Sequence, residues 1–178
     1  MNITIEPVAL ENRRPKPADE SKLGFGKIYS DHMFTMRWTA DGGWSDARVG
    51  AFDDLSLSPA ALVLHYGQTV FEGLKAYPNP NGTVNLFRAR DNAARFARSA
   101  ARLDLPTVDT DMFVAACQAL VDIDQRSADS VSRVKSVKPR EWPNQAKLLC
   151  AGAKLLSRVG YPYPVSYTHL TLPTIYSV

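Results

Sequence analysis

The sequence predicts an α+β domain of two layers, in which helices cover one face of a mostly antiparallel sheet. Three observations support this fold class. Residues 32–38 alternate between apolar and polar positions, two further apolar segments flank an Asn-Gly turn, and two amphipathic helical patterns follow from residue 91 onward. Strands therefore come first and helices afterwards, with short links between them, and this order favours α+β over an alternating α/β fold.

The first strand is expected over residues 32–38, because Phe34, Met36 and Trp38 recur at every second position. This period of two is typical of a half-buried strand. Asp41-Gly42-Gly43 follows, and glycine supplies the positive φ values of a tight turn. The chain from Trp44 onward is therefore predicted to return as the second strand of a hairpin.

A second hairpin is predicted from residues 71–77 and 83–87, which flank the turn sequence Pro-Asn-Pro-Asn-Gly at 78–82. Asn-Gly is a strong hairpin signal, because both residues tolerate positive φ. The segment 64–77, which leads into this hairpin, places aromatic residues between two glycines. The residues alone leave two interpretations open: a loop that enters a strand, or a binding loop.

Two helices are predicted after the hairpins. Asp91 is a candidate N-cap for the first, and its apolar stripe recurs at helical spacing, comprising Ala93, Phe96, Ala97, Ala100 and Leu103. Pro106 is expected to end this helix. Asp109 or Thr110 is expected to start the second, whose stripe comprises Met112, Ala116, Leu120 and Ile123.

The composition is that of an ordinary globular protein, with 45% hydrophobic and 22% charged residues among 178 and a formal net charge of +3. The basic residues form no nucleic-acid-binding module, and no apolar run approaches the roughly 18 residues of a membrane span, so we expect neither nucleic acid nor membrane as a partner. We expect no signal peptide and a cytoplasmic location. The cysteines and histidines do not lie at metal-ligand spacing, so we expect no metal site; they are Cys117, Cys150, His32, His65 and His169.

The chain divides into four segments by composition and patterning. Residues 1–23 are predicted to form a polar N-terminal arm, and residues 24–126 to form the patterned domain. Residues 127–163 lose the patterning, and residues 164–178 have a composition of their own.

Arginines at 95, 98 and 102 lie on the face of the first predicted helix opposite its apolar stripe. A solvated arginine face and an anion site both fit this pattern, because a guanidinium offers a rigid fork of donors matched to phosphate. The spacing does not decide between the two interpretations.

Three motifs carry a family resemblance. In order, the chain contains FGKIYSDHMFTMRW, LSLSPAALVLHYGQTVFEGLKAY and NLFRARDNAARFARSAARLDLP. This combination resembles the branched-chain amino acid aminotransferases, and the match runs from about Leu23 to Gln125, the N-terminal small domain of that family. D-amino acid aminotransferases and aminodeoxychorismate lyases share the scaffold but are less similar to these segments.

The resemblance implies a fold-type IV enzyme that uses pyridoxal phosphate. Such an enzyme would transfer the amino group of leucine, isoleucine or valine to 2-oxoglutarate, giving branched-chain 2-oxo acids and glutamate. It would serve branched-chain amino acid biosynthesis and act as a homodimer when complete. Another fold-type IV enzyme, or a non-catalytic binding domain on the same scaffold, are the alternatives.

The resemblance also implies roles for individual residues. Arg95 matches the family position that holds the cofactor's phosphate, and a guanidinium suits this role because it pairs with phosphate bidentately. Tyr66 and Phe71 match positions that line the substrate pocket, where aromatic walls suit an aliphatic side chain. Phe25 falls near a further aromatic of that pocket. The resemblance adds nothing for Arg98 and Arg102, which are expected to be solvated.

The chain departs from the family after residue 126. The family's Trp-Val-Pro segment and Ser-Leu-Tyr-x-Arg-Pro strand are replaced by residues 127–163, which a frameshift or a chimeric join would explain. The segment 165–174, VSYTHLTLPT, back-translates to a transposase adapter used in sequencing libraries, so residues 164–178 are predicted not to be coding sequence. The family's lysine that forms the Schiff base with the cofactor lies in a large domain absent from this chain. We therefore predict no catalytic residue here, and no transaminase activity for the chain alone.

Overall fold

The computed structural model describes residues 1–15, 28–78, 83–128, 148–156 and 168–177. The last two ranges, residues 125–128 and the single residues Ile28, Lys75 and Pro78 are described by their backbone alone. Three strands come first along the chain: β1 (Thr4–Ile5), β2 (Ile28–Thr39) and β3 (Gly43–Ala51). A one-turn helix α1 (Leu62–Tyr66) precedes the hairpin of β4 (Thr69–Pro78) and β5 (Val84–Leu86). Helices α2 (Ala89–Arg102) and α3 (Thr110–Ala128) follow, and then strands β6 (Leu148–Leu156) and β7 (Thr168–Ser177).

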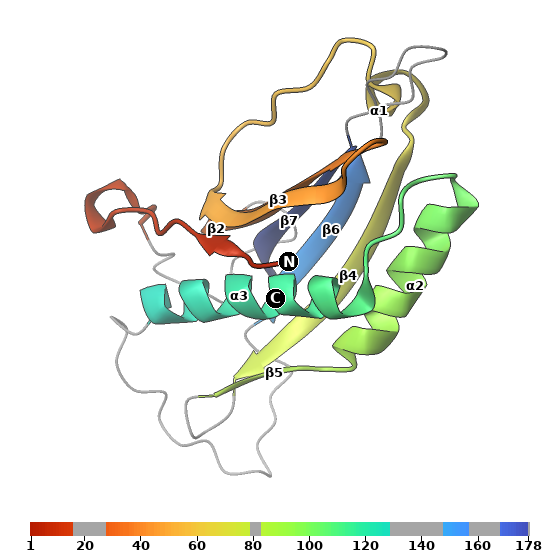
Figure 1. Ribbon diagram of the computed structural model, residues 1–178. Coiled ribbons are helices and arrows are strands. Elements are labelled where there is room, and N and C mark those ends of the chain that lie inside the picture. The colour runs from red at the N-terminus through yellow and green to blue at the C-terminus, as the bar shows by residue number, and fades with distance from the viewer. Residues whose placement is uncertain (16–27, 79–82, 129–147, 157–167, 178) are drawn as a thin grey trace.

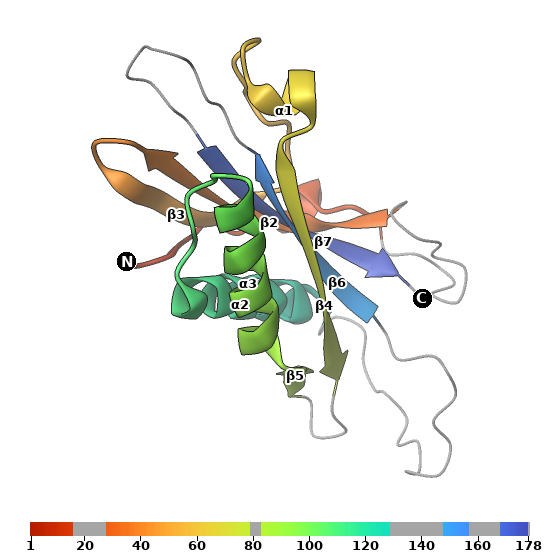
Figure 2. The ribbon, with the colours of Figure 1, turned by 90° about the vertical axis from the view of Figure 1, so that its right-hand side faces the viewer.

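All seven strands belong to one sheet, in the order β1-β3-β2-β7-β6-β4-β5. Every neighbouring pair is antiparallel except β1 and β3, which run parallel. Helices α2 and α3 lie on the same side of this sheet (Figures 1 and 2), and their apolar faces share one core with the inner face of the strands. The prediction of an α+β domain with helices on one face of a mostly antiparallel sheet is confirmed.

The hairpin of β2 and β3 forms as its alternation predicts. Phe34 and Met36 are buried against the helices, while Trp38 is only half-buried near the turn. Gly43 takes the positive φ of 64° that the tight turn requires. The register shifts between Thr35 and Arg37 because β3 carries one extra residue between Ser45 and Arg48, where Asp46 takes a positive φ of 56°, an irregularity that the sequence pattern does not reveal.

Strand β4 also alternates. Val70, Leu74 and Ala76 point into the core beneath the helices, whereas Phe71 and Gly73 are exposed. The hairpin with β5 is confirmed by the pairing of Tyr77 with Asn85. The turn predicted at 79–82 lies outside the described residues.

The prediction of Asp91 as the N-cap of α2 is wrong. The N-cap is Arg88, whose backbone is left-handed with φ 53°, and whose carbonyl accepts the Asp91 N–H at 2.9 Å. Asp91 lies in the first turn instead, where its carboxylate faces the positive end of the helix dipole and accepts from Arg88 Nε at 2.6 Å.

Leu103 is a second correction. The stripe of α2 is buried at Ala93, Phe96 and Ala100, but Leu103 is exposed. Helix α2 ends at Arg102, and Leu103 is its C-cap with φ −98°. Its side chain therefore leaves the helical phase, and the chain turns before Pro106 through Asp104, at φ 55°.

Helix α3 begins as predicted. Asp109 precedes it, and its Oδ1 accepts the N–H groups of Asp111 at 2.9 Å and Met112 at 3.1 Å. These bonds satisfy N–H groups that have no partner within the helix. The predicted stripe faces the core, and the face is wider than the prediction because Phe113 and Cys117 are also buried.

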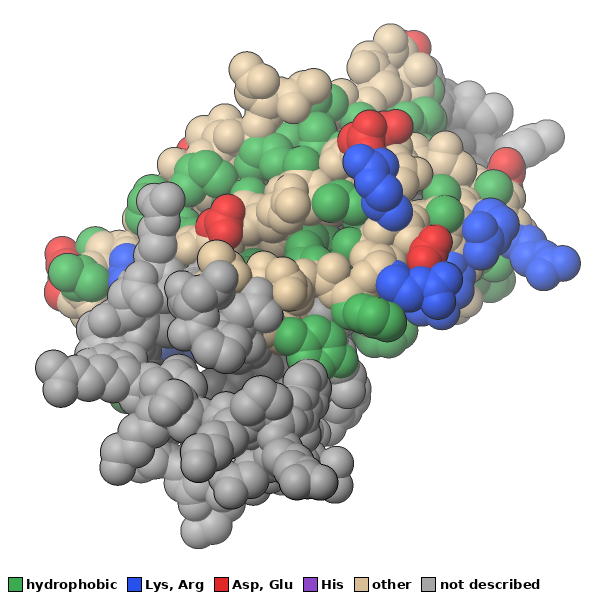
Figure 3. All heavy atoms as spheres, turned by 90° about the horizontal axis from the view of Figure 1, so that it is seen from below, with side chains coloured by type: hydrophobic (Ala, Val, Ile, Leu, Met, Phe, Trp, Pro, Cys, Tyr) green, Lys and Arg blue, Asp and Glu red, His purple; other side chains and the backbone are tan. Residues whose placement is uncertain are grey.

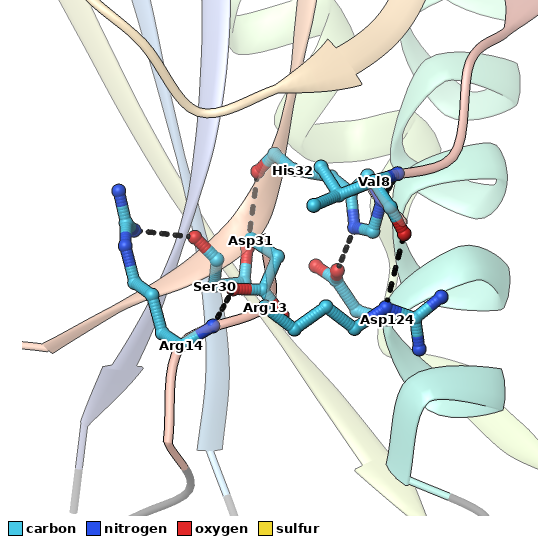
Figure 4. A network of polar contacts seen from close by, with 7 residues as sticks. All are labelled: Val8, Arg13, Arg14, Ser30, Asp31, His32 and Asp124. Carbon is cyan, nitrogen blue, oxygen red and sulfur yellow. Dashed lines mark hydrogen bonds and ion pairs between the residues drawn. The ribbon is translucent and has the colours of Figure 1, made fainter. Parts of the chain in front are cut away.

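The N-terminal arm is more firmly attached than its polar composition suggests. Its strand β1 pairs with β3, and the Val8 N–H donates to Nε2 of His32 at 3.0 Å. His32 is fully buried, and its Nδ1 lies 2.9 Å from Oδ1 of Asp124 on α3 (Figure 4). Because Nε2 accepts the hydrogen bond from the Val8 N–H, Nδ1 is the ring nitrogen that donates to Asp124. His32 therefore joins the arm, the sheet and α3.

Arg14 attaches the end of this arm to the edge of β2. Its guanidinium donates to the Ser30 carbonyl at 2.8 Å and its N–H to Asp31 Oδ1 at 2.9 Å (Figure 4). The same guanidinium lies 4.9 Å from the centroid of the Phe52 ring, a cation–π distance.

Strands β6 and β7 occupy the middle of the sheet, between β2 and β4. Within the described residues, β1, β2 and β3 form one group of paired strands and β4 and β5 another. The backbones of β6 and β7 join the two groups by antiparallel pairing. The sheet is therefore completed by strands from the two segments in which the sequence loses its family pattern.

The Cys117 thiol is expected to be unreactive in the folded chain. It is fully buried on α3, and this burial raises its pKa to about 12, so the nucleophilic thiolate is scarce at neutral pH. A Cys150→Ser variant leaves Cys117 as the sole cysteine of the chain. We expect iodoacetamide to alkylate it in denaturing guanidinium but not in native buffer, as measured by mass spectrometry; equal rates in both would contradict the buried position.

Candidate functional site

The predicted site residue Arg95 forms an ion pair with Glu72 across the α2–β4 interface. Arg95 Nε donates to Oε2 of Glu72 at 2.6 Å, and Arg95 Nη2 donates to Oε1. Glu72 follows the alternation of β4 and is 3% exposed, whereas the Arg95 side chain is 61% exposed. The pair therefore joins a buried carboxylate to a guanidinium at the surface.

Asn92 completes the surroundings of this carboxylate. It lies one helical turn before Arg95 on the same face of α2, and its Nδ2 donates both to Glu72 Oε1 and to the Gly73 carbonyl, each at 2.9 Å. The Gly73 N–H donates to Oε1 at 3.0 Å. Both carboxylate oxygens of Glu72 therefore have partners, as a buried carboxylate requires.

These contacts set the protonation of the pair. Burial raises the pKa of Glu72. The hydrogen bonds from Arg95, Asn92 and Gly73, together with the charge of Arg95, lower it by more than burial raises it, so the pKa lies below its ordinary value of 4.5. The hydrogen bond and charge of Glu72 raise the pKa of the Arg95 guanidinium. The pair is fully charged at neutral pH.

The ion pair of Glu72 with Arg95 should make the free energy of unfolding of the chain depend on pH in the acidic range. Because the folded-state pKa of Glu72 is lowered, its contribution is present above the unfolded-state pKa and is lost as the pH falls through the folded-state value. Between about pH 5 and pH 3, we expect the free energy of unfolding to fall more steeply in the parent than in Glu72→Gln, by up to about 1.4 kcal/mol per pH unit, the value for one proton. Urea titrations at a series of pH values measure this slope, and parallel curves would contradict the ion pair.

The two predicted aromatic residues lie on other surfaces of the domain. Phe71 is 63% exposed and points to the face of the sheet opposite Glu72, because successive side chains of a strand alternate. Tyr66, at the end of α1, is 82% exposed, and Gly67 follows it with a left-handed φ of 59°. The described residues thus do not bring Arg95 and Phe71 to one face. Phe25 lies outside the described residues.

The other candidate residues of known burial on this part of the chain, Arg98, Arg102 and His65, are exposed to solvent. Arg98 and Arg102 are exposed on α2. His65 is exposed, with Nε2 at 2.7 Å from the Pro59 carbonyl oxygen. Within the described part of the chain, no cluster of metal-ligating side chains is present and no helix is long and apolar enough to cross a membrane.

Two further ion pairs lie on the surface of the helical side. Arg88 lies beside Asp91, and Arg90 Nη1 lies 2.5 Å from Asp111 Oδ1. On the face seen in Figure 3, arginine and acidic side chains accordingly stand next to one another. A groove between β5, the start of α2 and α3 opens near these pairs, and none of the predicted site residues lines it.

Glu72 and Asn92 belong to the site but were not predicted from the sequence. One signal was available: in β4 an acidic residue occupies a position in phase with Val70 and Leu74, which predicts a buried carboxylate in need of a partner. The alternation of β2 likewise carried a signal at His32, which is in phase with Phe34 and Met36.

Comparison with solved structures shows that the chain shares its fold with part of several aminotransferase structures. The chain superposes on a branched-chain amino acid aminotransferase from Thermobaculum terrenum (M4 mutant) with a TM-score of 0.53 and 16% identity, over 85% of this chain and 40% of that one. The Escherichia coli branched-chain amino acid aminotransferase gives a TM-score of 0.51 and 19% identity, over 82% and 41% of the two chains.

Sequence comparison finds branched-chain aminotransferases that are similar to the N-terminal part of this chain. The branched-chain-amino-acid aminotransferase 2 of Bacillus subtilis is 44% identical over 122 residues, which are 68% of this chain and 33% of that protein. The branched-chain-amino-acid aminotransferase of Mycolicibacterium smegmatis is 44% identical over 103 residues, or 58% and 28%. No protein-family profile matches the chain. The N-terminal part of this chain is thus related to branched-chain aminotransferases, and the chain spans about a third of the length of the curated relatives it matches.

Proposed function

We propose that residues 24–126 are the small domain of a branched-chain aminotransferase that depends on pyridoxal phosphate. In its complete form this enzyme transfers the amino group of leucine, isoleucine or valine to 2-oxoglutarate. The observation that carries the proposal is the 44% identity to the Bacillus subtilis enzyme over 122 residues. The complete enzyme is proposed to be a cytoplasmic homodimer in branched-chain amino acid biosynthesis.

The chemistry of individual residues suits the cofactor and the substrate, although the structure places Arg95 and Phe71 on different faces of the sheet. Arg95 carries a permanent positive charge on a side chain that is 61% exposed, which suits a ligand of the cofactor's phosphate. Tyr66 and Phe71 offer exposed aromatic surface, which suits contact with an aliphatic substrate side chain. Phe25 is proposed as a further aromatic of that pocket.

Pyridoxal phosphate supplies the electron sink for amino transfer when it is bound, and the protein supplies orientation and charge. Arg95 would hold the phosphate and so fix the cofactor against the small domain. Tyr66 and Phe71 would exclude water from the substrate side chain. No residue of this chain is assigned to proton transfer at the substrate, and that step is proposed to belong to the large domain.

We further propose that residues 127–163 result from a frameshift or chimeric join and that residues 164–178 derive from a sequencing adapter. Among the described strands, the groups β1–β3 and β4–β5 are joined only through β6 and β7, so the sheet has two central positions between them. In the complete enzyme, the polypeptide that follows residue 126 would supply strands at these two central positions.

The chain alone is expected to be catalytically inactive. Incubated with pyridoxal phosphate, leucine and 2-oxoglutarate, it should form no glutamate and develop no protein-bound cofactor absorbance.

Exposed apolar side chains, among them Leu64, Tyr66 and Phe71, should favour self-association of the chain, which light scattering measures. Cofactor-dependent conversion of leucine by the purified chain would contradict the proposed division of the enzyme.

A chimera tests the proposed function itself. Residues 1–126 of this chain would replace the matching segment of the Bacillus subtilis enzyme, whose remaining two thirds supply the large domain. We expect this chimera to transaminate leucine with 2-oxoglutarate at a rate within about tenfold of the parent enzyme, a loss of at most about 1.4 kcal/mol of transition-state stabilisation. A folded chimera that acts on D-alanine instead would assign the domain to a D-amino acid aminotransferase, and a folded chimera without activity would favour a non-catalytic binding domain.

A further inference from the structure

We propose that Glu72 is a positioning residue, which holds Arg95 so that the outer edge of its guanidinium faces a phosphate group. The inference deepens the proposed function and rests on it, since that function makes Arg95 a phosphate ligand. It concerns a different residue, on a different element of the fold, and it is argued from the contacts of the Glu72 carboxylate.

The Glu72 carboxylate is fixed from three directions. Its Oε2 accepts from Arg95 Nε at 2.6 Å, and its Oε1 accepts from Asn92 Nδ2 at 2.9 Å and from the Gly73 N–H at 3.0 Å. The side chain is 3% exposed, so solvent does not compete for these bonds. A carboxylate held in this way provides a rigid anchor.

The edge of the Arg95 guanidinium that does not contact Glu72 faces outward. Arginine carries five N–H donors in a planar fork. Glu72 engages Nε and Nη2 of Arg95, on one side of that fork. The remaining Nη1 and Nη2 hydrogens point away from the carboxylate, on a side chain that is 61% exposed. This edge matches the two oxygens of a phosphate.

The pair is also oriented electrostatically. Its negative end is buried beneath α2, and its positive end lies at the surface, so an anion approaching from solvent meets the positive end first. Glu72 lowers the net charge of the site, but it fixes the fork of an otherwise mobile side chain. Preorganisation of this kind strengthens binding because fewer rotamers are lost when the ligand arrives.

The test is the affinity of the chimera for pyridoxal phosphate, measured by absorbance titration of the apo-protein without any assay of activity. We expect Glu72→Gln to weaken the affinity about tenfold or more, as the loss of partners that orient metal ligands does. Glu72→Asp keeps the charge but withdraws the carboxylate from Arg95, so we expect it to weaken the affinity by less than Glu72→Gln does. This variant serves as the test if Glu72→Gln does not fold. Asp111→Asn is the matched control, because it breaks an exposed ion pair between Arg90, which lies on the same helix as Arg95, and Asp111 on α3, and it should leave the affinity unchanged.

A double-mutant cycle separates positioning from general destabilisation. In an Arg95→Ala background, Glu72→Gln should have no further effect on the affinity, because no guanidinium remains to be held. Unchanged or tighter binding by Glu72→Gln, together with weak binding by Arg95→Ala, would overturn the inference and leave the proposed function intact. Unchanged binding by Arg95→Ala would instead contradict the role of Arg95 in the proposed function.

Discussion

Replacement of Phe113 by alanine is expected to destabilise the domain by about 3–5 kcal/mol. Phe113 is 1% exposed on α3, and its ring centroid lies 5.3 Å from that of Phe96 on α2. The substitution would remove the contact between the two helices and leave a cavity where they meet the sheet. Domains of this size are stable by about 5–15 kcal/mol, so the variant should lose a substantial part of that stability and unfold at a lower urea concentration than the parent.

Urea denaturation followed by circular dichroism measures this loss. Phe87→Ala is the matched control, because it makes the same chemical change at a side chain that is 67% exposed. We expect that control to lie within about 0.5 kcal/mol of the parent. Equal midpoints for the Phe113 and Phe87 variants would contradict the position of Phe113 in the core.

Replacement of Arg95 by alanine in the chimera is expected to reduce kcat/KM for leucine at subsaturating cofactor by about 100-fold or more. The reason is the loss of two charge-assisted hydrogen bonds to the phosphate, each worth about 1.5–3 kcal/mol. Arg95→Lys should recover only part of the loss, because a lysine cannot pair with Glu72 and with a phosphate through one planar fork.

Arg98→Ala provides the control for this prediction. Arg98 lies one turn further along α2 and is exposed. Its removal should change kcat/KM less than twofold, a difference of about 0.4 kcal/mol in transition-state stabilisation. If the Arg98 and Arg95 variants lose the same activity, Arg95 is not the specific ligand of the cofactor's phosphate, and the positive charge of the helix as a whole explains both losses.

Local patterns predicted most of the fold because the elements that carry them are amphipathic. The alternation of Phe34 and Met36 and the helical spacing of Ala116 and Leu120 both correspond to buried faces. Element ends were less predictable. Helix α2 begins three residues before the capping chemistry of Asp91 indicates, because Arg88 adopts a left-handed conformation that side-chain propensity disfavours.

The polar contacts of the site depend on pairing between distant elements. Glu72 and Arg95 lie 23 residues apart, and His32 and Asp124 lie 92 residues apart. Local periodicity can indicate that Glu72 and His32 are buried, but it contains no information about which partner each meets. The family resemblance identified Arg95 without its partner, because a motif records residue types and not contacts.

The central proposal is that residues 24–126 are the small domain of a branched-chain aminotransferase and that a join near residue 126 connects them to unrelated sequence. Long-read sequencing of the genomic locus across the codons of residues 120–178 tests it most directly. We expect the reading frame after residue 126 to continue into a Ser-Leu-Tyr-x-Arg-Pro strand and a large domain with a cofactor-binding lysine, with no adapter codons. Genomic codons that encode residues 127–178 as they stand, followed by a stop codon, would contradict the claim.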